Sequence, residues 1–144
     1  MPFILAAIGI VPYIANMSMQ DVIAVPLDYA RIEQGVSAAQ VQELIGKGLI
    51  SQEDVYRAVP ERTFKRRLAE KGNLRTEEAD AIARAMRVNE LARRVFGEDH
   101  EAKQFLDLPN PELGGRVPRV MAATDAGARE VEAVLYRFAF GDYS

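Results

Sequence analysis

The sequence predicts an all-α fold. Apolar residues recur at helical spacing through most of the chain after residue 36, and the alternation typical of strands is almost missing. Capping residues precede several of these segments, and glycines follow them. We therefore expect short helices separated by capped turns and arranged in two small lobes.

Composition excludes several classes of function. The chain has 144 residues, enough for one domain or two small ones, and about half of them are hydrophobic. It has no cysteine and only one histidine, His100, which excludes a disulfide scaffold, a cysteine nucleophile and the usual zinc modules. Carboxylate pairs such as Glu77 with Asp80 fall in first helical turns, where acids act as caps. We expect no enzyme activity, cofactor or metal.

The N-terminus is unusual because residues 1–20 carry no charge and residues 3–11 are apolar. A basic region that would mark a signal peptide is missing, and Pro12 interrupts any membrane span. This segment is expected to lie against the body of the protein or against a second copy. Alternatively, translation starts at Met17 or Met19. Without an export signal, we expect a cytoplasmic protein that binds no membrane.

The first helices are predicted from serine caps and a proline. Ser37 and Ser51 each have a capping partner three residues further on. Pro60 suits the first position of a helix, because its missing N–H is not needed there. In chain order, the expected helices run from Ser37 to Gly46 or Gly48, from Ser51 to Arg57, and from Pro60 to about Lys71, where Gly72 closes the last.

The later helices are predicted from acids, apolar spacing and glycines. Thr76 begins a long helix with acids in its first turn, where the helix dipole favours them. Apolar residues continue at helical spacing to Val95, and Gly97 ends the pattern. There follow a short helix at 99–106, a turn-rich loop at 108–115, and a final helix from Thr124 or Asp125 to Gly141, with Val131, Val134, Leu135 and Phe138 on one face.

One predicted helix is strongly basic although the whole chain has a net charge of −3. Six basic and two acidic residues lie between Pro60 and Arg75. At about 100° per residue, Phe64 and Leu68 share the core face. Together with the short helix before it, this pattern predicts a helix-turn-helix that binds DNA. The outward-facing residues at 62, 65, 66 and 69 can instead be a merely solvated surface.

In the DNA-binding interpretation, the start of the basic helix enters the major groove. Arg62 and Arg66 reach guanine edges there. Glu61 accepts a hydrogen bond from cytosine or simply favours the helix N-terminus. The remaining candidates contact phosphates, and the full set is Glu61, Arg62, Thr63, Lys65, Arg66, Arg67 and Lys71.

A glycine pair marks the loop before the last helix. Gly114 and Gly115 permit backbone shapes or close approaches that other residues do not allow. Such a loop can act as a rigid elbow between two helices. It could also cradle a phosphate through backbone N–H groups, but a P-loop lysine and a G-x-G-x-x-G arrangement are both missing.

These residues carry a family resemblance. The run Asn110-Pro-Glu-Leu-Gly-Gly-Arg-Val-Pro118, followed by Thr124-Asp-Ala-Gly127, resembles the C-terminal toxin-binding domain of Xre/MbcA/ParS-type antitoxins. Arg62-Thr-Phe-Lys-Arg-Arg67 resembles the helix-turn-helix of the same family. The likeness covers about residues 36–144. Phe105 stands where the family often has tryptophan, and Val117 where threonine is frequent. The motif residues are Asn110, Leu113, Gly114, Gly115, Pro118, Thr124 and Gly127.

The resemblance implies an antitoxin of a toxin–antitoxin system. Its expected partner is a RES-domain toxin that consumes NAD or transfers ADP-ribose from it. The C-terminal helix and tail would cover the NAD cleft of this toxin, while a homodimeric N-terminal lobe represses the operon. The residues placed near the toxin are Arg129, Glu132, Tyr136, Arg137, Phe140, Gly141, Asp142, Tyr143 and Ser144.

Aromatic and acidic residues near the C-terminus agree with this expectation. Tyr136, Phe140 and Tyr143 fall off the apolar stripe and form a candidate interface hot spot, unless Phe140 folds back onto the domain. The carboxylates of Asp142 and the chain end could mimic the pyrophosphate of NAD.

The expected organisation has three parts. Residues 1–28 form the apolar segment, residues 29–97 the helix-turn-helix and dimerisation domain, and residues 98–144 the toxin-binding domain. Two alternatives remain: a stand-alone transcription regulator that uses the same basic helix, and a toxin-binding protein whose helix-turn-helix is vestigial.

Overall fold

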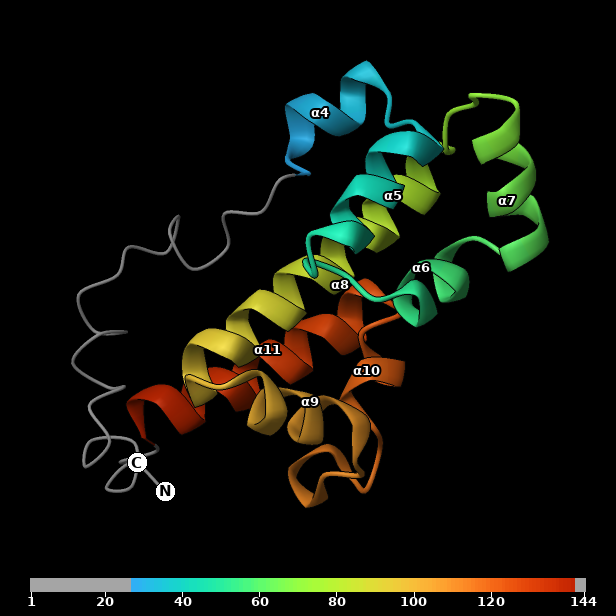
Figure 1. Cartoon of the computed structure of the whole chain (residues 1–144). Helices are drawn as coiled ribbons and strands as arrows, with labels where there is room; N and C mark the ends of the chain where they lie inside the picture. The colour runs from blue at the N-terminus through green and yellow to red at the C-terminus, as the bar shows by residue number, and fades with distance from the viewer. Residues whose placement is uncertain (1–26, 142–144) are drawn as a thin grey trace. The chain divides into compact units, whose positions relative to one another are not determined.

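The predicted all-α fold is confirmed by the computed structural model, which describes residues 27–141 (Figure 1). Within this range the chain forms eight α-helices and one short 3₁₀ helix, with no strand. The predictions for the apolar N-terminal segment and for Asp142, Tyr143 and Ser144 fall outside the described residues.

The described chain divides into two compact units, residues 27–86 and residues 87–141. The division falls inside helix α8 (Thr76–Phe96), between Met86 and Arg87. Each unit has its own buried apolar cluster, so each has an independent hydrophobic core.

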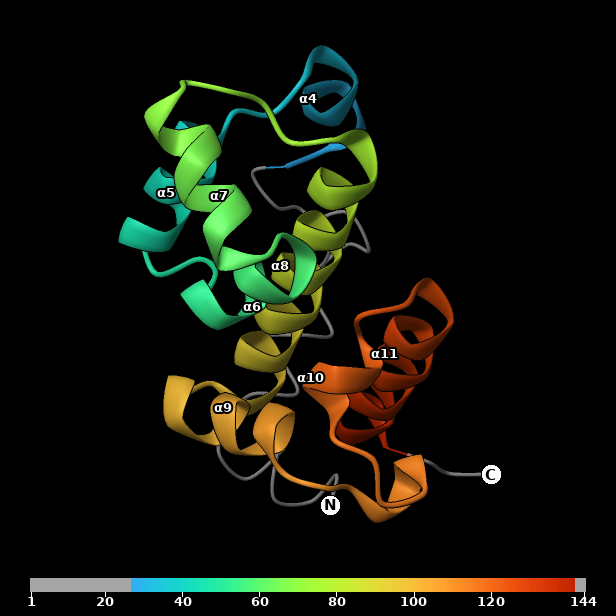
Figure 2. The same ribbon diagram turned by 90° about the vertical axis from the view of Figure 1, so that its right-hand side faces the viewer.

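The first unit, residues 27–86, gathers its helices around the N-terminal half of α8 (Figure 2). Phe64, Ile82 and Met86 are among its largest fully buried side chains. Its other helices are α4 (Tyr29–Gln34), α5 (Ala38–Gly46), α6 (Gln52–Ala58) and α7 (Glu61–Ala69).

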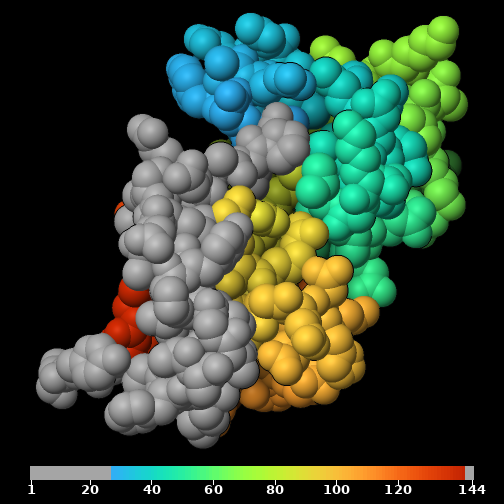
Figure 3. All heavy atoms as spheres, turned by 60° about the vertical axis from the view of Figure 1, so that its left-hand side comes forward, coloured from blue at the N-terminus to red at the C-terminus, as the bar shows by residue number. Residues whose placement is uncertain are grey.

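Helix α4 is not predicted by the sequence. It has only six residues and none is buried, so it leaves no periodic apolar pattern. It lies at the surface of the first unit, coloured blue in Figure 3. A local cap explains why it forms: the Asp28 carboxylate accepts a hydrogen bond from the backbone N–H of Arg31 at 2.9 Å.

The predicted serine caps are confirmed. The Ser37 hydroxyl accepts from the backbone N–H of Gln40 at 3.1 Å, and the Gln40 side chain accepts from the Ser37 N–H at 2.8 Å. The Ser51 hydroxyl accepts from the backbone N–H of Asp54 at 3.1 Å. After α5 the chain turns at a left-handed Gly48, with φ of 73°. These starts follow from local hydrogen bonds, which is why the sequence predicts them.

Helix α7 differs from the prediction at both ends. Pro60 is the N-cap that precedes the helix rather than its first residue. The left-handed residue after the helix is Lys71, with φ of 56°, and not Gly72. The Gly72 N–H donates to the Arg67 carbonyl at 2.7 Å, and the Lys71 N–H donates to the Leu68 carbonyl at 3.3 Å. This is the Schellman pattern, with lysine at the position that glycine usually occupies.

Replacing Lys71 with glycine is therefore expected to stabilise the protein by about 1 kcal/mol, because glycine adopts positive φ without strain. Urea unfolding of the full chain measures the effect. Lys71→Ala is the matched control, since it removes the same charge but keeps the strained backbone. Equal stability of the two variants would contradict the explanation.

The second unit, residues 87–141, packs its last helix against the rest of α8. Val131, Val134 and Leu135 are buried, as the periodicity predicts, and form one core with Val88 and Leu91. After α8, the chain continues into α9 and α10 before it reaches the last helix. These two helices lie side by side (Figures 1 and 2). The elements are α9 (Asp99–Asp107), a 3₁₀ helix η1 (Pro111–Leu113), α10 (Pro118–Met121) and α11 (Asp125–Phe140).

Three phenylalanines join helices α8, α9 and α11 of the second unit. The ring centroid of Phe105 lies 5.4 Å from that of Phe96 and 5.9 Å from that of Phe138. The third pair, Phe96 and Phe138, is 6.0 Å apart. Edge and tilted contacts of this kind stabilise aromatic clusters. Phe105 therefore anchors α9 between the rings contributed by α8 and α11.

Candidate functional site

Helices α6 and α7 are joined by a turn of only two residues, Val59 and Pro60. The Phe64 side chain on α7 is 1% exposed, and its ring meets that of Tyr56 on α6 edge to face, with centroids 6.2 Å apart. Leu68 is half-buried on the same face. The apolar face of α7 is thus fixed to the unit, as the periodicity predicts.

The opposite face of α7 is exposed and basic. Arg62, Lys65 and Arg66 all lie on it. Lys65 pairs with Glu61 at 2.5 Å, and this hydrogen bond raises the pKa of Lys65. Arg62 and Arg66 form no ion pair within residues 27–141, so their charges remain available to an external anion.

Three further candidates in this region differ in exposure. Thr63 is half-buried beside Arg62, and Glu61 is exposed in the first turn, where the helix dipole favours an acid. Lys71 is exposed just beyond the C-terminus of α7. Glu61 and Lys71 are therefore accessible to an external ligand, and Thr63 is accessible only in part.

Arg67 points away from this surface. Its guanidinium donates to both carboxylate oxygens of Glu78 at 2.7 Å, and its side chain is only 16% exposed. The sequence predicts a phosphate contact here, but the tertiary partner directs Arg67 into the unit. This ion pair links the C-terminal end of α7 to the first turn of α8.

Glu78 is a buried polar residue that the sequence pattern does not distinguish. It is 4% exposed, and it also accepts hydrogen bonds from the backbone N–H of Arg75 at 3.0 Å and from its Nε at 2.9 Å. Burial acts to raise the pKa of the Glu78 carboxyl, but the hydrogen bonds from Arg67 and Arg75 outweigh it and hold the pKa below its ordinary value. Glu77 beside it is exposed, and only packing distinguishes the two acids.

The glycine loop of the second unit satisfies its own backbone groups. The Asn110 carbonyl accepts from the N–H of Leu113 at 3.0 Å and of Gly115 at 2.9 Å, and the Asn110 side chain accepts from Glu112 at 2.8 Å. The N–H groups of Gly114 and of residue 116 also donate within the loop. Because these donors are occupied, the loop matches the predicted rigid elbow and not a phosphate cradle.

The positive φ angles of Gly114 and Gly115, 66° and 78°, close this loop. Leu113 is 4% exposed and anchors it in the core of the second unit, and Pro118 is buried at the start of α10. Helix α10 is only four residues long, so the sequence does not predict it.

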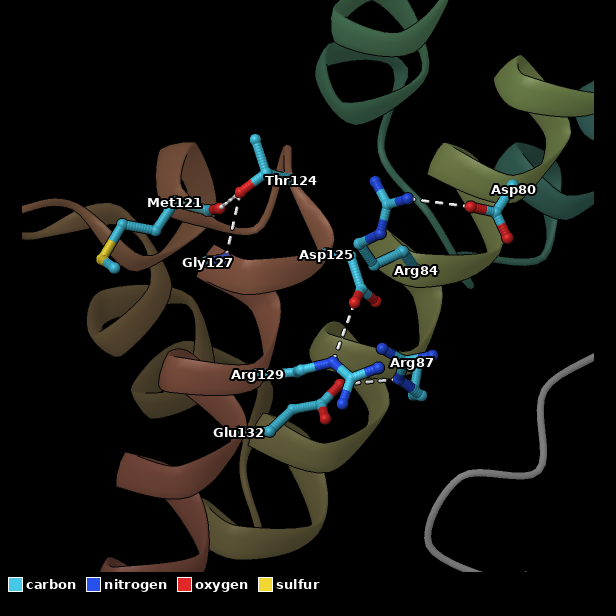
Figure 4. A network of polar contacts seen from close by, with 9 residues as sticks. All are labelled: Asp80, Arg84, Arg87, Met121, Thr124, Asp125, Gly127, Arg129 and Glu132. Carbon is cyan, nitrogen blue, oxygen red and sulfur yellow. Dashed lines mark hydrogen bonds and ion pairs between the residues drawn. The ribbon is translucent and has the colours of Figure 1, made fainter.

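Thr124 and Gly127 join α10 to α11 (Figure 4). The Thr124 hydroxyl accepts from the Gly127 N–H at 3.0 Å and donates to the Met121 carbonyl at 3.4 Å. A Cβ at position 127 would overlap the Met121 carbonyl group. The Thr-x-x-Gly spacing therefore serves a close backbone approach between two helices.

Arg119 connects three helices of the second unit, a role that its position in the sequence does not predict. It forms an ion pair with Asp107 at the end of α9 and donates to the side chain of Asn89 on α8 at 3.1 Å. Its side chain is 12% exposed. This arginine therefore holds α10 in place rather than presenting charge to solvent.

Two charged candidates on α11 are occupied by neighbours within the second unit (Figure 4). Arg129 pairs with Asp125 at 2.8 Å at the surface. Glu132 pairs with Arg87 at 2.6 Å, and its side chain is 17% exposed. Glu132 thus contributes to packing α11 against α8. The exposed Arg129 side chain can leave Asp125 for another acidic group at little cost in free energy, because a surface ion pair is weak.

The C-terminal end of α11 presents an aromatic pair. The rings of Tyr136 and Phe140 stack with centroids 6.2 Å apart and planes 16° apart, and Phe140 remains 42% exposed. Burial first, and then Glu132, raise the pKa of Tyr136. Phe140 thus contacts its own helix without entering the core. Arg137 beside it is exposed and has no ion pair within residues 27–141.

The described residues contain neither a membrane span nor a metal-binding cluster. No helix within residues 27–141 is long and apolar enough to cross a membrane. Within the same residues, acids and histidine do not gather into a group that could hold a metal ion.

Comparison with known proteins shows which family the chain is similar to. Residues 91–141 match the family model of the antitoxin Xre/MbcA/ParS C-terminal toxin-binding domain. The chain is 30% identical over 113 residues to an antitoxin Xre of Pseudomonas putida, an alignment that covers 78% of this chain and 71% of that protein. It is 31% identical over 116 residues to an antitoxin Xre of Yersinia enterocolitica, with 78% of each chain covered.

A third relative, an antitoxin Xre of Photorhabdus laumondii, is 28% identical over 115 residues, again with 78% of each chain covered. These alignments extend well beyond the C-terminal domain. The chain therefore belongs to the Xre/MbcA/ParS-type antitoxins.

Proposed function

We propose that this antitoxin binds a RES-domain toxin and covers its NAD site with the C-terminal end of α11 and the tail. The observation that carries the proposal is the exposed Phe140 at the end of α11, within the segment that matches the toxin-binding domain. Exposed aromatic side chains at the rim of a folded unit are typical interface anchors. The protein acts by excluding NAD and not by catalysis.

The tail supplies chemistry that suits this role. The side chain of Asp142 adds negative charge directly after α11 in the sequence. A pocket that binds the pyrophosphate of NAD attracts such charges. Arg137, whose charge is unpaired in the described chain, lies on the last turn and is available to an acidic group at the rim of the toxin cleft.

NAD consumption by the product of the neighbouring gene tests this proposal. We expect the full chain to block it, whereas a chain that ends at Phe140 should need more than about 30-fold higher concentration for half inhibition. Glu130→Ala is the matched control on the same helix and should inhibit within about twofold, because Glu130 is exposed and is not among the candidate contact residues. Full inhibition by the shortened chain would disprove the role of the tail and leave the helical surface as inhibitor.

We also propose that the exposed face of α7 binds the operator of its own operon. Arg62 and Arg66, which are exposed and unpaired in the described chain, support this role. We assign base-edge contacts to them and phosphate contacts to Lys65 and Lys71, while Arg67 holds α7 against α8. A homodimer would present two such helices to a palindromic site.

Salt-dependent binding to the DNA directly upstream of the reading frame tests this second role. Lys65→Ala should lower affinity and reduce the slope of log K against log salt by about 1, as expected for one lost phosphate contact. Lys47→Ala, an exposed cation at the end of α5, is the control and should leave the slope unchanged. An unchanged slope for Lys65→Ala would argue against this surface.

The two experiments also separate the alternatives. Operator binding without any effect on the neighbouring gene's product favours a stand-alone regulator. Inhibition without operator binding favours a toxin-binding protein with a vestigial helix-turn-helix. Both partners, the operator and an NAD-consuming enzyme, would place the protein in the cytoplasm.

A further inference from the structure

We infer that the outer face of α11 binds the same face of a second copy of this chain, with the two helices antiparallel. This face consists of exposed residues that follow one another at alternating spacings of four and three, namely Ala126, Glu130, Ala133, Arg137 and Phe140. Such spacing keeps all of them on one side of a helix. The pairing is separate from the homodimer proposed for the N-terminal lobe.

Two opposite charges on the outer face carry the inference. Glu130 and Arg137 are exposed, and neither forms an ion pair within residues 27–141. An ion pair within a helix needs a partner three or four residues away, and α11 has no base at those distances from Glu130 and no acid at those distances from Arg137. The two charges are themselves about 10.5 Å apart along the helix axis. Both charges therefore need a partner outside α11.

An antiparallel second copy supplies both missing partners together. When the twofold axis passes beside Ala133, Glu130 of each copy lies opposite Arg137 of the other. At about 100° per residue, these two residues lie on the same edge of the outer face, and the twofold axis brings this edge against its counterpart. A parallel arrangement would instead place like charges together. The charge pattern thus favours a second copy and also sets its direction.

The apolar residues of the outer face fit the same arrangement. Phe140, which stacks on Tyr136 and is 42% exposed, would lie over the small Ala126 of the second copy. Ala133 would meet its own counterpart beside the twofold axis, where a small side chain lets two helices approach closely. One register therefore pairs both charges and covers the exposed aromatic ring.

Self-pairing and toxin binding would exclude each other, because Arg137 and Phe140 also belong to the proposed toxin surface; this consequence rests on the proposed function. One helix face offers less area than the roughly 800 Å² per partner of a stable interface. We expect a reversible contact with a dissociation constant above about 10 µM. Inhibition measured at much lower concentrations is then insensitive to it, so Glu130→Ala remains a valid control there.

Disulfide cross-linking tests the register directly. The chain has no cysteine, so Ala133→Cys introduces a single thiol, which would meet its counterpart in the second copy. Ala126→Cys is the matched control, because antiparallel pairing separates its two thiols by about 20 Å, far beyond the reach of a disulfide. Under mild oxidation of the full chain at about 100 µM, we expect Ala133→Cys to cross-link at least about tenfold faster than Ala126→Cys.

Charge exchange tests the ion pairs. In the Ala133→Cys chain, either Glu130→Arg or Arg137→Glu places like charges together at both contacts and should slow cross-linking about tenfold. A mixture of these two variants has opposite charges at both contacts. Its disulfide-linked heterodimer, identified by mass, should form within about twofold of the rate of the Ala133→Cys chain. Thermal unfolding of each variant checks that the fold is kept.

Three results would overturn the inference. Equal cross-linking at positions 126 and 133 would indicate a parallel or non-specific contact. Failure to cross-link at position 133 would exclude this pairing, and the rate of maleimide labelling of the same thiol then shows whether the face is free or covered by another part of the chain. A mixture that cross-links no faster than its separate variants would exclude the ion pairs.

The proposed toxin surface is tested separately in the same assay. The purified product of the neighbouring gene, added before the oxidant, should suppress cross-linking of the Ala133→Cys chain. If cross-linking remains unchanged, the toxin does not bind this face of α11, whereas the pairing of two copies stands.

Discussion

Replacing Gly127 with alanine is expected to destabilise the second unit by about 3 kcal/mol or more and to abolish toxin binding with it. The added Cβ would overlap the Met121 carbonyl group and would press on the Thr124 hydroxyl at 3.0 Å. Both groups are backbone or capping atoms, so neither can rotate away as a flexible side chain would. Relief requires α10 to move away from the first turn of α11.

Such a movement would break several interactions together. The Thr124 hydroxyl would lose its acceptor at Met121 or its donor at Gly127. Arg119, on the same short helix, would be pulled from Asp107. Thermal unfolding should show a midpoint lower by roughly 10 °C or more for this unit.

Gly46→Ala is the control for this prediction. Gly46 is also a helical glycine, but a Cβ there meets no atom within 4 Å. The same substitution should therefore be neutral or stabilise by about 0.5 kcal/mol, because alanine favours the helix. A stable Gly127→Ala variant that still binds the toxin would disprove the close-approach explanation.

Replacing Glu78 with glutamine is expected to destabilise the first unit by about 2–3 kcal/mol at neutral pH. Glutamine keeps the shape but loses the charge that pairs with Arg67, whose side chain is only 16% exposed. It also cannot accept two hydrogen bonds from Arg67 through two equivalent oxygens. The exposed neighbour Glu77 provides the control, since Glu77→Gln should change the stability by less than about 0.5 kcal/mol.

The pH dependence of this effect has a defined sign. The folded-state pKa of Glu78 lies below its ordinary value of 4.5, so the charged carboxylate stabilises the fold above that pH. This contribution is lost as the pH falls through the folded-state pKa. The difference in unfolding free energy between wild type and Glu78→Gln should therefore be constant near neutral pH and shrink below pH 4.5.

Denaturant unfolding at several pH values measures this difference. If the difference in unfolding free energy between wild type and Glu78→Gln stays constant into the acid range, Glu78 does not act through its charge. A double-mutant cycle with Arg67→Ala should show coupling of at least about 1 kcal/mol. Operator binding by Glu78→Gln, measured where the variant is folded, then reports whether the orientation of α7 matters for DNA.

Local signals let the sequence predict most helix boundaries of this chain. Ser37, Ser51 and Thr124 cap helices through hydrogen bonds within one turn, so the pattern is visible without any tertiary contact. The buried faces of α7 and α11 also follow from spacing alone. The sequence does not predict helices α4 and α10, because segments of six and four residues are too short to show a helical repeat of apolar residues.

The sequence predicts the candidate surfaces only in part. Helical spacing shows the direction in which a side chain points but not the residue that it contacts. Arg66 and Arg67 are adjacent and chemically identical, yet Arg66 is exposed while Arg67 is bound to Glu78 from another helix. The sequence by itself determined the all-α fold, the caps and the basic and aromatic positions, since these depend on neighbours along the chain. Only the tertiary structure decided which charges face solvent and why Gly127 must lack a side chain, since those depend on contacts between helices.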